Sequence, residues 1–155
     1  MPKASVKRLI ECKKKDLIDL VLDIEKYPEF VPFCFGAKIY ENKRTDYNDI
    51  AKKACRFLDK DDRVILFCGS GFGMAIQANR FKGARAVVCF DVFDVEQARQ
   101  HNDMNVLCIG ADYTDFDTAK YMIEAFFETK FLKGRHTRRV EKLDEDTNTN
   151  WTNLQ

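Results

Sequence analysis

The 155-residue sequence has no apolar run that approaches the roughly 18–20 residues needed to cross a bilayer. Its N-terminal region is too polar to supply the apolar core of a signal peptide. The formal net charge is only +1, so no overall field attracts nucleic acid or an anionic membrane. Internal repeats and low-complexity linkers are absent as well. These absences favour a cytoplasmic protein with no nucleic-acid or membrane partner.

No two of the six cysteines form a CxxC pair, and no His, Asp and Glu residues have the spacing of metal ligands. Zinc sites and thioredoxin-like centres use close cysteine pairs, so we expect no metal. Without a secretion signal, disulfides are not expected either. Cys89 and Cys108 fall inside apolar runs, which predicts small core residues. Cys68 differs from both because glycines follow it.

The most informative part of the chain is the segment 64–74. Four apolar residues, 64–67, predict a short buried strand, and alternating glycines then predict a turn into a helix through residue 79. Glycines lack a Cβ atom, so main-chain N–H groups can approach an anion closely at the positive end of a helix. Cys68 and Ser70 lie at the mouth of this turn, which places a possible base beside an anion site. The glycines are Gly69, Gly71 and Gly73.

Helices and strands alternate from residue 45 onward. The predicted strands are 64–67, 86–90 and 105–109, and the predicted helices are 49–58, 74–80, 95–100 and 118–129. Near-continuous apolar strands separated by helices predict a parallel sheet covered on both faces. In residues 1–44, strands at 6–12 and 37–41 flank a helix at 16–24. We therefore expect a single α/β domain over 1–143 with a five-stranded, doubly wound, Rossmann-like sheet, and a flexible polar tail at 144–155.

Several short motifs follow one another in a fixed order between residues 46 and 143. They are Asp46-Tyr47, Cys68-Gly69-Ser70-Gly71-Phe72-Gly73-Met74, Ala78-Asn79-Arg80, Gly83-Ala84-Arg85-Ala86, His101-Asn102-Asp103-Met104-Asn105 and Gly134-Arg135-His136-Thr137-Arg138-Arg139-Val140. In this order they resemble the B-type ribose-5-phosphate isomerases, relatives of the galactose-6-phosphate isomerase subunits. The resemblance implies a cofactor-free enzyme that interconverts ribose 5-phosphate and ribulose 5-phosphate. It also implies a homodimer or tetramer in which the neighbouring subunit completes each active site.

The first 41 residues depart from that family, whose members open with a strand that ends in an Asp-His-Ala-Gly turn. The corresponding segment 12–16 lacks that aspartate and histidine, whereas 20–34 resembles the start of START-like, coenzyme-Q-binding proteins. Asp112 is a second departure, because the family usually carries a phosphate-binding arginine there. A carboxylate would repel a sugar phosphate, and we hypothesise that Lys13 or Lys14 restores the lost positive charge.

Aldose–ketose isomerisation moves a proton between adjacent carbons through an enediolate, and it needs a base and donors to the oxyanion. We expect Cys68 to be the base, because amides at a helix N-terminus stabilise a thiolate. The alternative is a buried structural cysteine at a strand end. Ser70 and the loop amides would stabilise the oxyanion, unless the glycines only form a tight turn.

The resemblance implies that His101, beside Asn102, opens the furanose ring across the dimer interface. Arg135 and Arg139 are four residues apart, so on a helix they would share one face and bind phosphate oxygens. His136 lies between them and is assigned to the same substrate-binding group. The alternative is a solvated basic patch.

Tyr47 is expected to line the sugar pocket and Asn79 to support the loop, although both residues could simply pack. Both are assigned, with Asn102, to the substrate-binding group. Three functions remain open at this point. The first is the isomerase, and the second is a relative that binds sugar phosphates but has lost turnover, as the missing Asp-His turn and Asp112 suggest. The third takes the START-like opening at face value and predicts a lipid- or quinone-binding module.

Overall fold

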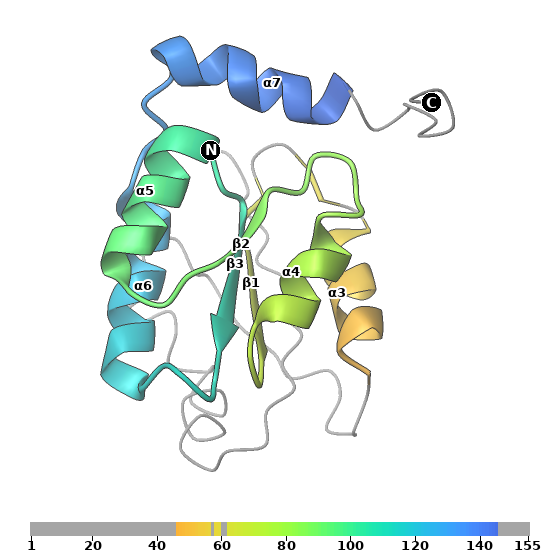
Figure 1. Cartoon of the computed structure of the whole chain (residues 1–155), viewed down its shortest axis with the longest axis vertical. Helices are drawn as coiled ribbons and strands as arrows, with labels where there is room; N and C mark the ends of the chain where they lie inside the picture. Colours follow the sequence, from red (N-terminus) through yellow and green to blue (C-terminus); the bar gives the residue numbers. More distant parts are fainter. Residues whose placement is uncertain (1–45, 57, 60–61, 146–155) are drawn as a thin grey trace, which may run out of the picture.

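Three parallel strands form a sheet in the computed structural model, which describes residues 46–56, 58–59 and 62–145. The strands are β1 (Val64–Cys68), β2 (Ala86–Val88) and β3 (Val106–Gly110), in the order β1-β3-β2. Cys68 pairs with Gly110 at one end of the sheet, and Val106 pairs with both Val64 and Ala86 at the other. All carboxyl ends therefore meet at one edge, which is the lower end in Figure 1.

Four helices cover the two faces of this sheet. Helices α3 (Tyr47–Cys55) and α4 (Phe72–Ala78) lie on one side, and α5 (Val92–Asn102) and α6 (Phe116–Glu128) lie on the other (Figure 1). Side chains of β1 alternate between the two layers: Leu66 packs into the core under α3 and α4, and Phe67 packs into the core under α5 and α6. This alternation follows from the two-residue period of a strand. The predicted parallel α/β fold with helices on both faces is thus confirmed.

The five-strand count is not confirmed by the described part of the chain, which contains three strands. The expected strands at 6–12 and 37–41 and the expected helix at 16–24 lie outside the described residues. At the other end, a short 3₁₀ helix, η2 (Gly134–His136), leads into α7 (Thr137–Glu145). Helix α7 therefore enters the segment predicted as a tail by two residues, and 146–155 lie outside the described residues.

The helices begin earlier than the apolar periodicity predicts. Helices α5 and α6 start at Val92 and Phe116 instead of residues 95 and 118, because Asp91 and Asp115 cap their first turns. The side chain of Asp91 accepts a hydrogen bond from the Asp94 N–H at 2.8 Å. Such caps precede the first buried residue, so a pattern of buried residues misses them. Helices α3 and α4 likewise start two residues earlier than expected, and α3 ends at Cys55 instead of residue 58.

Gly71 shapes the connection between β1 and α4. Its φ of +79° is in the left-handed region, which favours glycine. A Cβ atom there would also lie 3.1 Å from Val88 Cγ1 and 3.2 Å from the Gly110 nitrogen. The turn therefore needs glycine both for its conformation and for its close approach to the end of β3.

We expect Gly71→Ala to destabilise the protein more than Gly83→Ala, measured as the free energy of unfolding in urea. Both glycines have positive φ, but a Cβ at Gly83 meets nothing within 4 Å. Gly83→Ala should therefore cost only the left-handed strain of about 1–2 kcal/mol. Gly71→Ala should cost roughly 1–3 kcal/mol beyond that, because the new methyl group is overpacked. Equal losses in the two variants would contradict the close-packing argument.

Candidate active site

Cys68 ends β1 at the carboxyl edge of the sheet, where its side chain is partly buried. The N–H of Gly71 donates a hydrogen bond to Cys68 Sγ at 3.1 Å. An amide that donates to a sulfur stabilises negative charge on it. The left-handed conformation of Gly71 therefore has a chemical consequence, since the turn back over the strand end directs this amide at the thiol.

The other described cysteines are buried and lack these surroundings. Burial raises the pKa of the Cys55 thiol to about 11. Burial, followed by the nearby carboxylates of Asp94 and Asp91, raises the pKa of Cys89 to about 12. Burial also raises the pKa of Cys108 well above its ordinary value. Among the described thiols, Cys68 is thus the candidate for reaction, whereas Cys12 and Cys34 lie outside the described residues.

Ser70 and Tyr47 flank the same turn. The N–H of Phe72 donates to Ser70 Oγ at 3.4 Å, so the hydroxyl lies at the start of α4. The ring of Tyr47 lies directly on Gly73, where a Cβ atom would come within 2.6 Å of the ring. Cys68, Ser70, Tyr47 and the glycine turn are therefore gathered at one place, which we call the Cys68 loop (residues 68–73 with Tyr47).

Asp112 also lies against the Cys68 loop. Its N–H donates to the carbonyl oxygen of Gly69 at 2.9 Å. A Cβ atom on Gly69 would lie 3.0 Å from Asp112 Oδ2. The structure thus places a carboxylate beside the turn that was predicted to hold an anion.

A second group of predicted site residues lies at the opposite edge, where the strands begin. His101 is near the end of α5, and its ring stacks on that of His136 with 4.5 Å between centroids and 10° between planes. Arg135 Nε donates to His136 Nε2 at 3.4 Å. Figure 1 shows α7, which follows His136, lying across this end of the sheet. We call His101, Asn102, Arg135, His136 and Arg139 the histidine group.

Burial lowers the pKa of His136, and the neighbouring His101, Arg135 and Arg139 lower it further. A neutral imidazole ring agrees with the geometry, because Nε2 accepts the hydrogen bond from Arg135. The positive charges that disfavour a histidinium are suited to bind an anion at the same place.

The expectation that Arg135 and Arg139 lie on one α-helix is wrong, whereas their shared face stays a prediction. Arg135 belongs to η2, whereas Arg139 belongs to α7. Lys133 and Gly134, with φ of +59° and +58°, lie at the start of the 3₁₀ turn and before both arginines. Both arginines are exposed, and both are close enough to His136 to act on its charge.

The Cys68 loop and the histidine group do not meet within one chain. They lie at opposite ends of β3, and a strand of five residues with a rise of about 3.3 Å per residue separates its ends by about 13 Å. Cys68 and His101 of one chain therefore cannot contact the same reacting carbon of a small molecule.

Asn79 lies away from the Cys68 loop, at the end of α4. Its side-chain nitrogen donates to the carbonyl oxygen of Ala86, and its side-chain oxygen accepts from the Ala86 N–H, both at 2.8 Å. Both polar atoms of this amide thus extend the pairing of β2. Its assignment to substrate binding stays a prediction.

A connected polar network that was not expected from the sequence lies beside the histidine group and consists of Arg85, Arg99, Asp103 and Asn105. A signal was present, because Arg85, Asp103 and Asn105 all belong to the ordered motifs. Across the described ranges, no cluster of His, Cys, Asp and Glu could hold a metal ion. The helices found there are too short or too polar to cross a membrane.

The parallel sheet with helices on both faces defines an α/β protein of the Rossmann-like class, with a cysteine–glycine turn at the carboxyl ends of the strands. The chain belongs to the Ribose/Galactose Isomerase family, whose family model matches residues 12–143. That match includes most of the N-terminal segment, so it extends beyond the residues 46–143 that carry the motifs.

Similar proteins and solved structures have names that agree with this family. The chain is 38% identical over 106 residues to ribose-5-phosphate isomerase B of Escherichia coli, covering 67% of this chain and 71% of the relative. The structure of ribose 5-phosphate isomerase B from Anaplasma phagocytophilum matches with a TM-score of 0.71 and 35% identity, covering 89% of this chain and 97% of the other. Type B ribose 5-phosphate isomerase from Trypanosoma brucei matches with a TM-score of 0.76 and 32% identity, covering 91% and 99%.

We expect iodoacetamide to alkylate Cys68 faster than the three other described cysteines in the folded protein. Of the described cysteines, Cys68 alone is partly accessible, and burial disfavours the thiolates of Cys55, Cys89 and Cys108. Peptide mapping by mass spectrometry after timed labelling measures each rate, and labelling in urea supplies the reference. Faster labelling of Cys89 than of Cys68 would show that the thiol environments are wrongly described.

Proposed function

We propose that this protein is a sugar-phosphate isomerase that interconverts ribose 5-phosphate and ribulose 5-phosphate through an enediolate. Membership of the Ribose/Galactose Isomerase family supports an isomerase of this class. The observation that carries the proposal is the partly accessible thiol of Cys68. Its sulfur accepts a hydrogen bond from the Gly71 N–H at 3.1 Å, in a turn that requires glycine.

In this proposal the Cys68 thiolate removes the proton from C2 of the open-chain aldose, and the electron pair moves to form the enediolate. The resulting thiol returns the proton to C1, and the proton of the C2 hydroxyl passes to the C1 oxygen, which yields the ketose and regenerates the thiolate. The Gly71 N–H already donates a hydrogen bond to the sulfur, so it stabilises the thiolate. Stabilisation of the enediolate oxygen then falls to the Ser70 hydroxyl and the Gly73 amide, while Tyr47 lines the sugar side of the loop.

We further propose that each active site combines the Cys68 loop of one copy with the histidine group of a second copy in a homodimer. The separation of about 13 Å between the ends of β3 supports two copies, because one chain cannot bring both groups to one sugar. His101 would donate a proton to the ring oxygen and open the furanose. Arg135 and Arg139, with His136 and Asn102, would hold the phosphate and neighbouring hydroxyls.

One observation favours a second candidate function, a relative that binds sugar phosphates without turnover. The carboxylate of Asp112 lies against Gly69 in the Cys68 loop. A negative charge there opposes a developing enediolate, whereas the phosphate is proposed to bind at the histidine group. Binding without isomerisation would then be the activity of the protein.

The proposal predicts isomerisation of ribose 5-phosphate by the wild-type protein, and a loss of at least about 100-fold in kcat for Cys68→Ala. The loss follows because a general base contributes about 100-fold to 10,000-fold. The matched control is Cys55→Ala, which removes a buried thiol at the end of α3 opposite Tyr47 and should leave kcat unchanged. A coupled spectrophotometric assay measures ribulose 5-phosphate formation.

Wild-type protein that binds ribose 5-phosphate in calorimetry without turning it over would establish the second candidate. Turnover that survives Cys68→Ala would remove the thiol from the mechanism. Assays with other aldose phosphates test the assignment of the substrate.

The two-copy site predicts complementation between inactive variants. Cys68→Ala and His101→Asn should each be nearly inactive, but an equimolar mixture refolded together should recover about a quarter of wild-type activity. Half of the randomly formed dimers are mixed, and one of the two sites in each mixed dimer keeps both residues. A mixture as inactive as its components would show that the loop and the histidine do not act across two copies.

A further inference from the structure

Asp103 ends helix α5 in an unusual conformation, directly after His101 and Asn102. Its φ of +48° and ψ of +44° lie in the left-handed region, where non-glycine residues are uncommon. Such a conformation persists where surrounding contacts determine it. The contacts of Asp103 therefore fix the direction of the chain after α5 and the orientation of His101.

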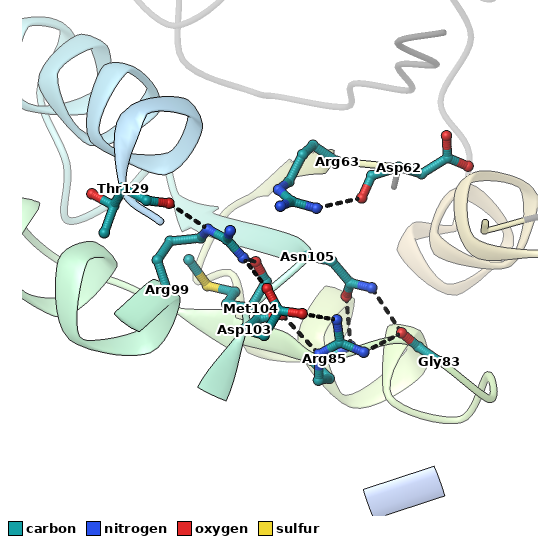
Figure 2. Close-up of polar contacts among 9 residues, drawn as sticks. All are labelled: Asp62, Arg63, Gly83, Arg85, Arg99, Asp103, Met104, Asn105 and Thr129. Carbon is teal, nitrogen blue, oxygen red and sulfur yellow. Dashed lines mark hydrogen bonds and ion pairs between the residues drawn. The ribbon is translucent and has the colours of Figure 1, made fainter. Parts of the chain in front are cut away.

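Two arginines hold Asp103 from opposite sides (Figure 2). Arg85 Nη2 lies 2.9 Å from Asp103 Oδ2, and Arg85 Nε donates to the Asp103 carbonyl oxygen at 2.7 Å. Arg99 Nη1 lies 2.9 Å from Asp103 Oδ1. We call these three residues the Asp103 clamp. Their side chains are only 12%, 4% and 26% exposed for Arg85, Arg99 and Asp103, so solvent screens these ion pairs less than surface pairs.

Arg85 is itself fixed by the segment before β2 and by the start of β3. Its Nη1 donates to the carbonyl oxygen of Gly83 at 3.2 Å, and its main-chain N–H donates to Asn105 Oδ1 at 2.7 Å. Asn105 Nδ2 also donates to the Gly83 oxygen at 2.7 Å. The arginine is therefore pre-organised before it contacts Asp103.

Arg99 connects the clamp to α6. Its Nε donates to the carbonyl oxygen of Thr129, directly after α6, at 3.2 Å, and its Nη1 also donates to the Met104 carbonyl oxygen. Its guanidinium lies 5.9 Å from the centre of the Phe126 ring. One carboxylate thus joins the ends of α5 and α6 and the beginnings of β2 and β3.

The same end of α5 carries the rest of the histidine group. The N–H of Leu132 donates to the Gln100 carbonyl oxygen at 3.0 Å, which attaches the segment before η2 to α5. The stacked rings of His101 and His136 make a second connection. A shift of the α5 end would therefore move both histidines and Arg135.

We propose that Asp103, Arg85 and Arg99 are positioning residues that set the orientation of His101 and the attached histidine group for catalysis. The catalytic part of this inference rests on the proposed isomerase function. None of the three needs to contact the sugar, because each acts through the end of α5. The two carboxylate oxygens of Asp103 face different elements. Oδ2 accepts from Arg85, which precedes β2, and Oδ1 accepts from Arg99 of α5.

The test is Asp103→Asn, which removes the charge but keeps a residue that tolerates the left-handed conformation. Its matched control is Asp91→Asn, the same change at the first turn of α5, where asparagine also caps well. The sequence contains two histidines, so imidazole proton signals are assigned with His136→Asn alone. In Asp103→Asn we expect the His101 signal to lose the shift caused by the stacked ring, and kcat to fall by up to about 100-fold, as misplacement by an ångström can produce.

Asp91→Asn should change neither the His101 signal nor kcat. An unchanged His101 signal in Asp103→Asn overturns the positioning role, and so does a displaced signal with unchanged kcat. If Asp103→Asn does not fold, Arg85→Lys replaces it, because lysine keeps the charge and loses the second donor to Asp103. An unchanged His101 signal in that variant overturns the inference equally. Should the wild-type protein lack isomerase activity, the proposed function fails, whereas the histidine signals still decide whether the clamp orients His101.

Discussion

The direction of the parallel strands is the constraint on which the site depends. Because β1, β2 and β3 all run the same way, residues that follow strands collect at one edge and residues that precede strands collect at the other. Cys68 ends a strand, whereas His101 lies near the end of a helix that returns to the strand beginnings. The Cys68 loop and the histidine group are thereby separated by the length of β3, which is why the proposed site uses two copies of the chain.

The side chain proposed to react at each edge is held in a different way. At the carboxyl edge, the positive φ of Gly71 turns the chain so that its amide reaches Cys68 Sγ, and Gly73 leaves room for the ring of Tyr47. At the opposite edge, Asp103 also has a positive φ, but ion pairs to Arg85 and Arg99 hold it. The geometry at the carboxyl edge depends on glycines, which have no side chains, whereas the geometry at the opposite edge depends on ion pairs.

Much of the fold could be predicted from the sequence because buried strands are short and nearly all apolar, as in 64–67 and 105–109. Helix starts could not, since Asp91 and Asp115 act by hydrogen bonds to main-chain N–H groups and not by burial. The helix expected to carry both Arg135 and Arg139 is divided, because a 3₁₀ turn carries Arg135 before α7 begins.

By itself the sequence determined which chemical groups the protein carries, namely one glycine-flanked thiol, two histidines and a group of arginines. It also contains the ordered motifs that indicate the family. Only the tertiary structure decided which of these groups share an edge of the sheet. It also showed that Asn79 extends the pairing of β2, that Asp112 lies against the Cys68 loop and that Asp103 is held by two arginines. Spacing along a chain specifies local geometry, whereas contacts such as that between Arg85 and Asp103, 18 residues apart, form only when strands and helices pack.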